Sequence, residues 1–337
     1  MKETIYFGTY TRRISEGIYT ASLDTESGLL ENLQLFTEEP SPSYLTMDKT
    51  FHLYSVGAVG KEGGIAGFSS LDGRLINHQV KDGAPLCYVA VDNDRSLVYG
   101  ANYHLGQIMV YKKNMHGQLE TTDMVQHKGS GPHKNQESPH AHFSNLSPDK
   151  YLVTCDLGTD KVETYEVRDA GKLTKINSYS ASPGAGARHL VFHPTKKIAY
   201  LLCELNSTIE VLIYDGHGAF EKLQTISTLP KDYTGDNGTA AIRISKDGNF
   251  VYASNRGHNS IASYKVLADG SLENIQIISS QGKTPRDFNL STDNKILVVA
   301  NQDSDNVTTF LRDQNSGYLT EIQHDFKLPE GTCVYVD

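Results

Sequence analysis

Seven side chains that could bind an anion or move a proton recur at matching places in a repeated pattern. They are His140, His142, Arg188, His189, Glu204, Arg256 and Arg286. Arginine presents a planar fork of N–H donors that suits a carboxylate or a phosphate. A glutamate near a histidine can supply a general base and a general acid. These residue types predict a pocket for a small anion, although the chain has a net charge of −9.

The pattern that carries these residues is a unit of four short apolar strands that returns six times. Its copies begin at Ser43, Cys87, His142, Arg188, Ala240 and Arg286, at intervals of about 44 to 55 residues. A period in this range, with four strands per unit, is typical of β-propeller blades. The strands are rich in Val, Ile, Tyr, Phe and Thr and are bounded by turn residues such as the Asp-Gly pairs at 247–248 and 269–270.

The two ends of the chain complete the count of blades. Residues 4–36 match the second, third and fourth strands of the unit, and residues 332–337 match a first strand alone. We therefore predict an all-β, seven-bladed propeller whose seventh blade is formed by about 1–36 plus 332–337. Pairing the chain ends closes the ring and removes an open sheet edge. Residues 1–337 are expected to form a single domain, and a monomer, because a closed ring needs no partner.

This architecture explains why the candidate residues should meet. In a blade, the first strand lies nearest the central axis and the second strand returns antiparallel beside it. The start of strand one and the end of strand two therefore lie at the same mouth of the channel. Strand starts supply His140, His142, Arg188, His189 and Arg286, and strand ends supply Asn102, Glu204, Asn255, Arg256 and Asn301. The charged residues fall in blades three to six, although solvated rims also carry polar residues and ion pairs that are purely structural.

Composition excludes several other classes of protein. A negative chain does not suit nucleic acid, whose phosphates require a basic surface. No run of 18 apolar residues could span a membrane. The chain opens directly on a strand, so a cytoplasmic location is expected. Its four cysteines are widely spaced without a CxxC motif, which predicts reduced thiols. The His-x-His at 140–142 lacks an evident third ligand, so a metal site is not expected.

Four stretches of sequence resemble one family. GAGARHLVFHPTKKIAYLLCELNSTIEV, SPHAHFSNLSPD, VYASNRGHNSI and TPRDFNL are similar to the bacterial lactonase family of seven-bladed propellers. That family includes the propeller-type 6-phosphogluconolactonases and, more distantly, the fungal carboxy-cis,cis-muconate cyclases. The resemblance extends over essentially the whole chain.

The resemblance implies an active site made of a histidine, two arginines and a glutamate. The matching residues are His142 (or His140), Arg188, Glu204 and Arg256, with Arg286 as the alternative to Arg256. The implied reaction is the cofactor-independent hydrolysis of 6-phosphoglucono-1,5-lactone to 6-phosphogluconate, in the pentose phosphate pathway. Either Glu204 or His142 would activate the water. The remaining candidates, His140, His189, Arg286, Asn102, Asn255 and Asn301, are expected to bind the phosphorylated substrate.

Two other functions stay open at this point. The same arginines would serve a lactonase for another sugar or hydroxy acid, or a muconate-type cycloisomerase. A propeller without enzymatic activity, binding a protein or peptide on its rim, is the alternative of a different class. That alternative requires exposed apolar patches at the mouth rather than a charged pocket.

Overall fold

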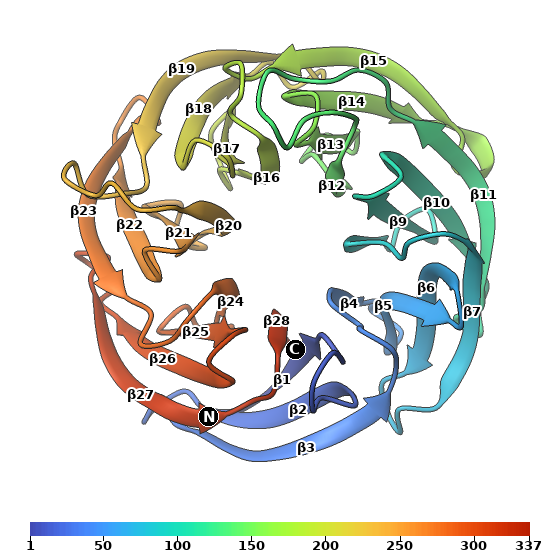
Figure 1. Cartoon of the computed structure of the whole chain (residues 1–337), viewed down its shortest axis with the longest axis horizontal. Coiled ribbons are helices and arrows are strands. Elements are labelled where there is room, and N and C mark those ends of the chain that lie inside the picture. Colours follow the sequence, from blue (N-terminus) through green and yellow to red (C-terminus); the bar gives the residue numbers. More distant parts are fainter. The chain divides into compact units, whose positions relative to one another are not determined.

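The computed structural model describes residues 1–337 and contains seven four-stranded antiparallel sheets. In six sheets the four strands follow one another in sequence. The seventh joins β28 (Gly331–Val336) to β1 (Lys2–Thr9), β2 (Gly17–Asp24) and β3 (Leu30–Glu38). Figure 1 shows the red β28 next to the blue β1, and Phe7 is paired with Val334. The predicted closure of one sheet by the two chain ends is therefore confirmed.

The chain divides into two compact units. Unit 1 consists of residues 1–35, 189–213 and 222–337, and unit 2 consists of residues 36–188 and 214–221. The expectation of a single domain is not tested by this division and stays a prediction. The candidate residues are divided as well, because His140, His142 and Arg188 belong to unit 2, whereas Glu204 and Arg256 belong to unit 1.

Unit 1 holds the sheet of the chain ends and most of three others. Their strands are β16 (Ala187–Phe192), β17 (Ile198–Cys203), β18 (Thr208–Tyr214), β19 (Phe220–Ser227), β20 (Gly238–Ile244), β21 (Phe250–Arg256), β22 (Ser260–Val266), β23 (Leu272–Ser279), β24 (Pro285–Leu290), β25 (Ile296–Asn301), β26 (Asn306–Arg312) and β27 (Leu319–Lys327). First strands of neighbouring sheets pack together, β20 against β24 and β24 against β28. Buried apolar faces of adjacent sheets form the core, as with Phe7 and Val298.

Unit 2 holds the other three sheets. Their strands are β4 (Leu45–Met47), β5 (His52–Val59), β6 (Glu62–Ser69), β7 (Leu75–Asp82), β8 (Tyr88–Asp92), β9 (Leu97–Asn102), β10 (Gln107–Lys113), β11 (Leu119–Gln126), β12 (Ala141–Leu146), β13 (Leu152–Asp156), β14 (Lys161–Val167) and β15 (Leu173–Ser180). The first strands pack in the same way, β4 against β8 and β8 against β12. The one helical element is a 3₁₀ turn at Asp169–Gly171.

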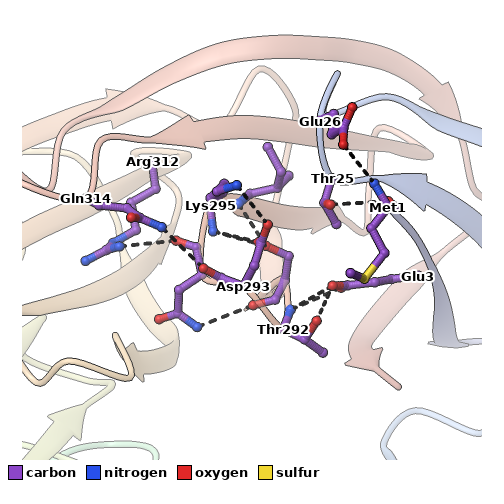
Figure 2. Close-up of polar contacts among 12 residues, drawn as sticks. Met1, Glu3, Thr25, Glu26, Thr292, Asp293, Lys295, Arg312 and Gln314 are labelled. Carbon is purple, nitrogen blue, oxygen red and sulfur yellow. Dashed lines mark hydrogen bonds and ion pairs between the residues drawn. The ribbon is translucent and has the colours of Figure 1, made fainter.

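Polar contacts join two neighbouring sheets of unit 1 near the start of β1. Figure 2 shows the Glu3 carboxylate accepting hydrogen bonds from the backbone N–H and the hydroxyl of Thr292, which lies in the β24–β25 turn. Close by, Gln314 donates to the carbonyl oxygen of Asp293 at 3.3 Å. The Glu3–Thr292 bonds anchor one end of β1, while its other end leads to Tyr10.

The Asp-Gly turns and the free thiols are found as the sequence predicts. Gly248 and Gly270 of the predicted Asp-Gly turns have φ of +74° and +91°, which glycine adopts without strain. All four cysteines are free thiols, and all but Cys87 are buried. The structure contains no helix with the length and hydropathy of a membrane-spanning segment.

Candidate functional site

In unit 1 the structure brings Glu204 and Arg256 together. Glu204 follows β17 directly and Arg256 is the last residue of β21, so both stand at the end of a second strand. Arg256 Nη2 lies 2.8 Å from Glu204 Oε1, and the two side chains are 19% and 21% exposed. A charge-assisted pair that is only partly exposed keeps more of its attraction than a fully solvated one.

Backbone carbonyl groups fix the Arg256 guanidinium further. Its Nε donates to the oxygen of Gly238 at 3.3 Å, and Nη2 donates to the oxygen of Thr239 at 2.9 Å. Nη1 has no partner within the protein, so one end of the fork is free to bind a ligand. A Cβ on Gly238 would stand 3.3 Å from Arg256 Nη2 and 3.5 Å from Glu204 Cγ. Glycine at this position therefore leaves room for the pair.

Arg286 lies elsewhere in unit 1 and makes no ion pair. It is the second residue of β24, and its Nη1 is 3.4 Å from Gln302 Oε1. Its guanidinium carbon lies 5.1 Å from the centroid of the Tyr10 ring. The structure thus pairs Arg256, and not Arg286, with Glu204.

In unit 2 the two candidate histidines share one aromatic neighbour. His140 and His142 flank Ala141 at the start of β12, and each is 7% exposed. The Tyr103 ring stacks on His140 with centroids 4.4 Å apart and meets His142 edge-on at 5.9 Å. His140 Nδ1 donates to the carbonyl oxygen of Tyr103 at 3.0 Å. Nε2, which lies 3.5 Å from the exposed Glu137 carboxylate, is the nitrogen that remains for acid–base chemistry. Tyr103 follows the predicted strand end at Asn102, a position that could have indicated it.

A buried carboxylate holds the chain segment that carries His140. Asp156 Oδ1 accepts the backbone N–H of His140 at 2.8 Å, and Oδ2 lies 2.7 Å from His127 Nδ1. His127 Nε2 in turn lies 3.1 Å from the hydroxyl of Tyr165, which also bonds to Glu163. Burial, and then the bond to Glu163, raise the pKa of Tyr165 far above its usual value, so it remains a neutral phenol. This network positions the loop before β12.

A second carboxylate of the same turn holds the segment that leads to Arg188. Asp160 accepts the backbone N–H groups of Gly184 at 2.7 Å and Gly186 at 2.6 Å, together with Gln136 Nε2 at 2.7 Å. The two glycines have φ of +79° and +74°, which disfavours any residue with a Cβ. Arg188, two residues later on β16, is only 2% exposed. The β13–β14 turn therefore braces the approach to both first strands.

The three predicted asparagines bond within their own sheets or to adjoining loops. Asn102 donates to the oxygen of Ala84 at 2.8 Å and accepts the N–H of Leu105 at 3.0 Å. Asn255 donates to the oxygen of Thr228 at 2.8 Å, and Asn301 donates to the oxygen of Ser280 at 3.2 Å. All three are at most 1% exposed, so the structure gives them a bracing role. Contact with the substrate stays a prediction for them, as it does for His189, which is 4% exposed on β16.

The structure thus contains two groups of candidate residues. In unit 1, Glu204 and Arg256 are in contact. In unit 2, His140 and His142 meet through Tyr103. That Arg188 and a histidine act on the same substrate as Glu204 stays a prediction. No group of three or more His, Cys, Asp or Glu side chains is arranged to hold a metal ion.

Comparison with known proteins decides the family. Residues 4–336 match the family model described as "Lactonase, 7-bladed beta-propeller". The chain belongs to this lactonase family. The match covers nearly the whole chain and confirms the predicted seven-bladed fold as well as the resemblance seen in the sequence motifs. Membership supports hydrolysis of a lactone as the chemistry.

Three relatives illustrate the range of this lactonase family. The 6-phosphogluconolactonase of Bacillus subtilis is 38% identical over 338 residues, covering 98% of this chain and 97% of the relative. A crystal structure of a protein from Lactobacillus plantarum is 46% identical, with a TM-score of 0.99 over 100% of both chains. The structure of the periplasmic gluconolactonase of Pseudomonas aeruginosa is 28% identical, with a TM-score of 0.91 over 100% of this chain and 99% of the other.

Proposed function

We propose that this lactonase hydrolyses 6-phosphoglucono-1,5-lactone to 6-phosphogluconate. The observation that carries the proposal is the Glu204–Arg256 pair, a carboxylate and a guanidinium 2.8 Å apart with Nη1 of the arginine free. A relative of this chain at 38% identity is a 6-phosphogluconolactonase. Cytoplasmic location, a role in the pentose phosphate pathway and independence from any cofactor belong to the same proposal.

The residue types define the chemistry of each step. Arg256 Nη1 donates to the carbonyl oxygen of the lactone and stabilises the negative charge that develops there. Glu204 accepts a proton from water as the water oxygen forms a bond to the carbonyl carbon. The bond between that carbon and the ring oxygen then breaks, and the ring oxygen takes up a proton. His142 or His140, assigned from sequence, is the acid for this last transfer.

The test is a rate assay on freshly generated 6-phosphogluconolactone, corrected for spontaneous hydrolysis. Glu204→Gln and Arg256→Ala should each lower kcat/KM at least about a hundredfold, because one removes the base and the other the oxyanion donor. The matched control is Arg168→Ala, which breaks the exposed Arg168–Glu166 pair and should leave the rate unchanged. Full activity in both site variants, with the fold intact, would refute this site.

A second substrate is favoured by one observation, the similarity to the periplasmic gluconolactonase of Pseudomonas aeruginosa. The Glu204–Arg256 pair acts on the lactone group alone, so it suits glucono-1,5-lactone equally well. A panel of phosphorylated and unphosphorylated lactones separates the two. A kcat/KM for gluconolactone equal to or above that for the phosphorylated substrate would favour the second candidate.

A further inference from the structure

A second arginine group lies in unit 1, apart from the Glu204–Arg256 pair. Tyr10 follows β1, and the guanidinium carbon of Arg12 lies 3.8 Å from the centroid of its ring. The guanidinium of Arg286, from β24, lies 5.1 Å from the same centroid. Both distances fall in the range of cation–π contacts. One ring thus holds two cations that are far apart in sequence.

Neither of these two cations is neutralised by a carboxylate. Six other arginines each have a carboxylate partner: Arg13, Arg95, Arg168, Arg243, Arg256 and Arg312. The only polar contact of the Arg286 side chain is the 3.4 Å approach to Gln302, which is too long for a strong bond. Two like charges on one ring repel each other, and a bound anion would relieve that repulsion. In a chain of net charge −9, such a pair points to an anionic ligand.

The loop that presents Tyr10 and Arg12 is held in place by the protein itself. The buried Glu330 carboxylate accepts the backbone N–H groups of Arg12, Arg13, Ile14 and Ser15 at 2.9 to 3.2 Å. Tyr10 N–H also donates to the carbonyl oxygen of Glu330 at 3.0 Å. Burial opposes ionisation of Glu330, but these four bonds outweigh it and keep its pKa below the usual value. The loop is therefore organised before any ligand arrives.

Strand pairing places this group beside the Glu204–Arg256 pair within unit 1. Gly238 at the start of β20 is paired with Arg256, and Pro285 at the start of β24 is paired with Asn301. Thr9 is paired with Gly331 at the start of β28. Because β24 packs against both β20 and β28, these strand ends are neighbours. Arg286 lies in the sheet next to that of Arg256. Packed sheets are about 10 Å apart, a separation that a phosphorylated six-carbon lactone can span.

We propose that Arg12, Tyr10 and Arg286 form the subsite for a phosphate group at the end of the substrate remote from the lactone carbonyl. The inference rests on the proposed function and names what would distinguish a phosphorylated from an unphosphorylated lactone. Tyr10 supplies the surface on which the two guanidinium groups are fixed, and the guanidinium N–H groups bind the phosphate oxygens.

The test compares two substrates in one double variant, Arg12→Gln with Arg286→Gln. Loss of two charge-assisted contacts should lower kcat/KM for 6-phosphogluconolactone about a hundredfold. The kcat/KM for gluconolactone should change less than about twofold, because that substrate has no phosphate. An equal effect on both lactones, or no effect on either, overturns the subsite.

Two matched variants check the geometry. Arg13→Gln removes the same charge one residue away, but Arg13 is paired with Asp305 at 2.7 Å, so selectivity for the phosphorylated lactone should persist. Tyr10→Phe keeps the ring and should retain that selectivity, whereas Tyr10→Ala should lose it about tenfold. Loss of selectivity in Arg13→Gln equal to that in Arg12→Gln would show a general charge effect and overturn the proposal.

A binding measurement separates failure of the subsite from failure of the proposed function. If the unaltered protein hydrolyses neither lactone, the proposed function fails, and calorimetry with inorganic phosphate and 6-phosphogluconate tests the subsite alone. The unaltered protein should then bind both, and the double variant should bind each at least about tenfold more weakly. Equal affinity in the two proteins, or no binding to the unaltered protein, refutes the subsite.

Discussion

The two groups of candidate residues are held in opposite ways. In unit 2, His140, His142 and Arg188 are at most 7% exposed, and buried Asp156 and Asp160 brace the backbone around them. In unit 1, Glu204 and Arg256 are about one-fifth exposed and form an ion pair, and two carbonyl groups accept hydrogen bonds from Arg256. From this difference we expect substitutions around the first group to lower the stability of the fold, and substitutions in the second group to change it little.

The largest expected effect concerns the unit 2 group, whose backbone is braced by Asp156 and Asp160. Asp160→Ala should lower the free energy of unfolding by about 3 kcal/mol, because it leaves the N–H groups of Gly184 and Gly186 without their acceptor. Chemical denaturation monitored by circular dichroism measures the loss. The exposed Asp169→Ala serves as control and should change little. If Asp160→Ala costs no more than its control, the bracing of Arg188 by this turn is wrong.

The second expected effect concerns the partly exposed Glu204–Arg256 pair of unit 1. Glu204→Gln should keep the free energy of unfolding within about 1 kcal/mol of the unaltered protein, because its pair is partly solvated. Its activity should nevertheless fall at least about a hundredfold. Denaturation curves and lactonase rates on the same preparation measure both quantities. A loss of stability as large as that of Asp160→Ala would remove the contrast between the two groups.

The pH dependence of unfolding tests another buried carboxylate of unit 2, Asp48. Burial opposes ionisation of Asp48, but bonds from Lys113, His52 and Thr50 lower its pKa to about 2. Since the unfolded pKa is about 3.9, Asp48 stabilises the fold above about pH 4, and this contribution is lost as the pH falls toward 2. Asp48→Asn should therefore cost about 2 kcal/mol at pH 7 and flatten the pH dependence of unfolding between pH 4 and 2. Parallel pH profiles for the two proteins would contradict this assignment.

The smallest effects are expected from substituting two glycines, one beside each group of candidate residues. Gly238→Ala places a Cβ 3.3 Å from the end of the flexible Arg256 side chain, so it should cost less than about 1 kcal/mol but lower kcat/KM up to about tenfold. Gly184→Ala meets nothing closer than 3.8 Å but has φ of +79°, so it should cost about 1 kcal/mol of stability. Denaturation curves and rates of both variants are the measurement. A loss of stability in Gly238→Ala together with a loss of activity alone in Gly184→Ala would contradict the difference between the two groups.

Much of the fold was predictable because propeller sheets repeat locally. The period of the strand pattern and the split first and last segments predict seven sheets, and the structure pairs β28 with β1. Strand boundaries were less predictable at the first copy, where β4 is only three residues long and begins at Leu45 rather than Ser43. A strand so short carries almost no alternation of apolar and polar residues, so its start cannot be located from the sequence.

The candidate site was predictable only in part. Alignment of the copies correctly placed Glu204 and Arg256 at matching strand ends, where they form an ion pair. Tyr10 and Tyr103 follow predicted strand ends, but their contacts, like those of Asp160, were not predictable, because each acts through a loop whose path the repeat does not determine. The pair of carboxylates at the two ends of the β13–β14 turn was visible in the sequence, but nothing there indicates which N–H groups they accept.

The sequence by itself determined the architecture and the chemical types of the candidate residues. Apolar alternation and turn residues are local, and a repeat of them leaves few ways to bury the strands. Only the tertiary structure decided that Arg256 is paired with Glu204 while Arg286 and Arg12 share Tyr10. These choices depend on side-chain directions and loop paths between sheets, where residues far apart in sequence meet at distances of a few ångströms.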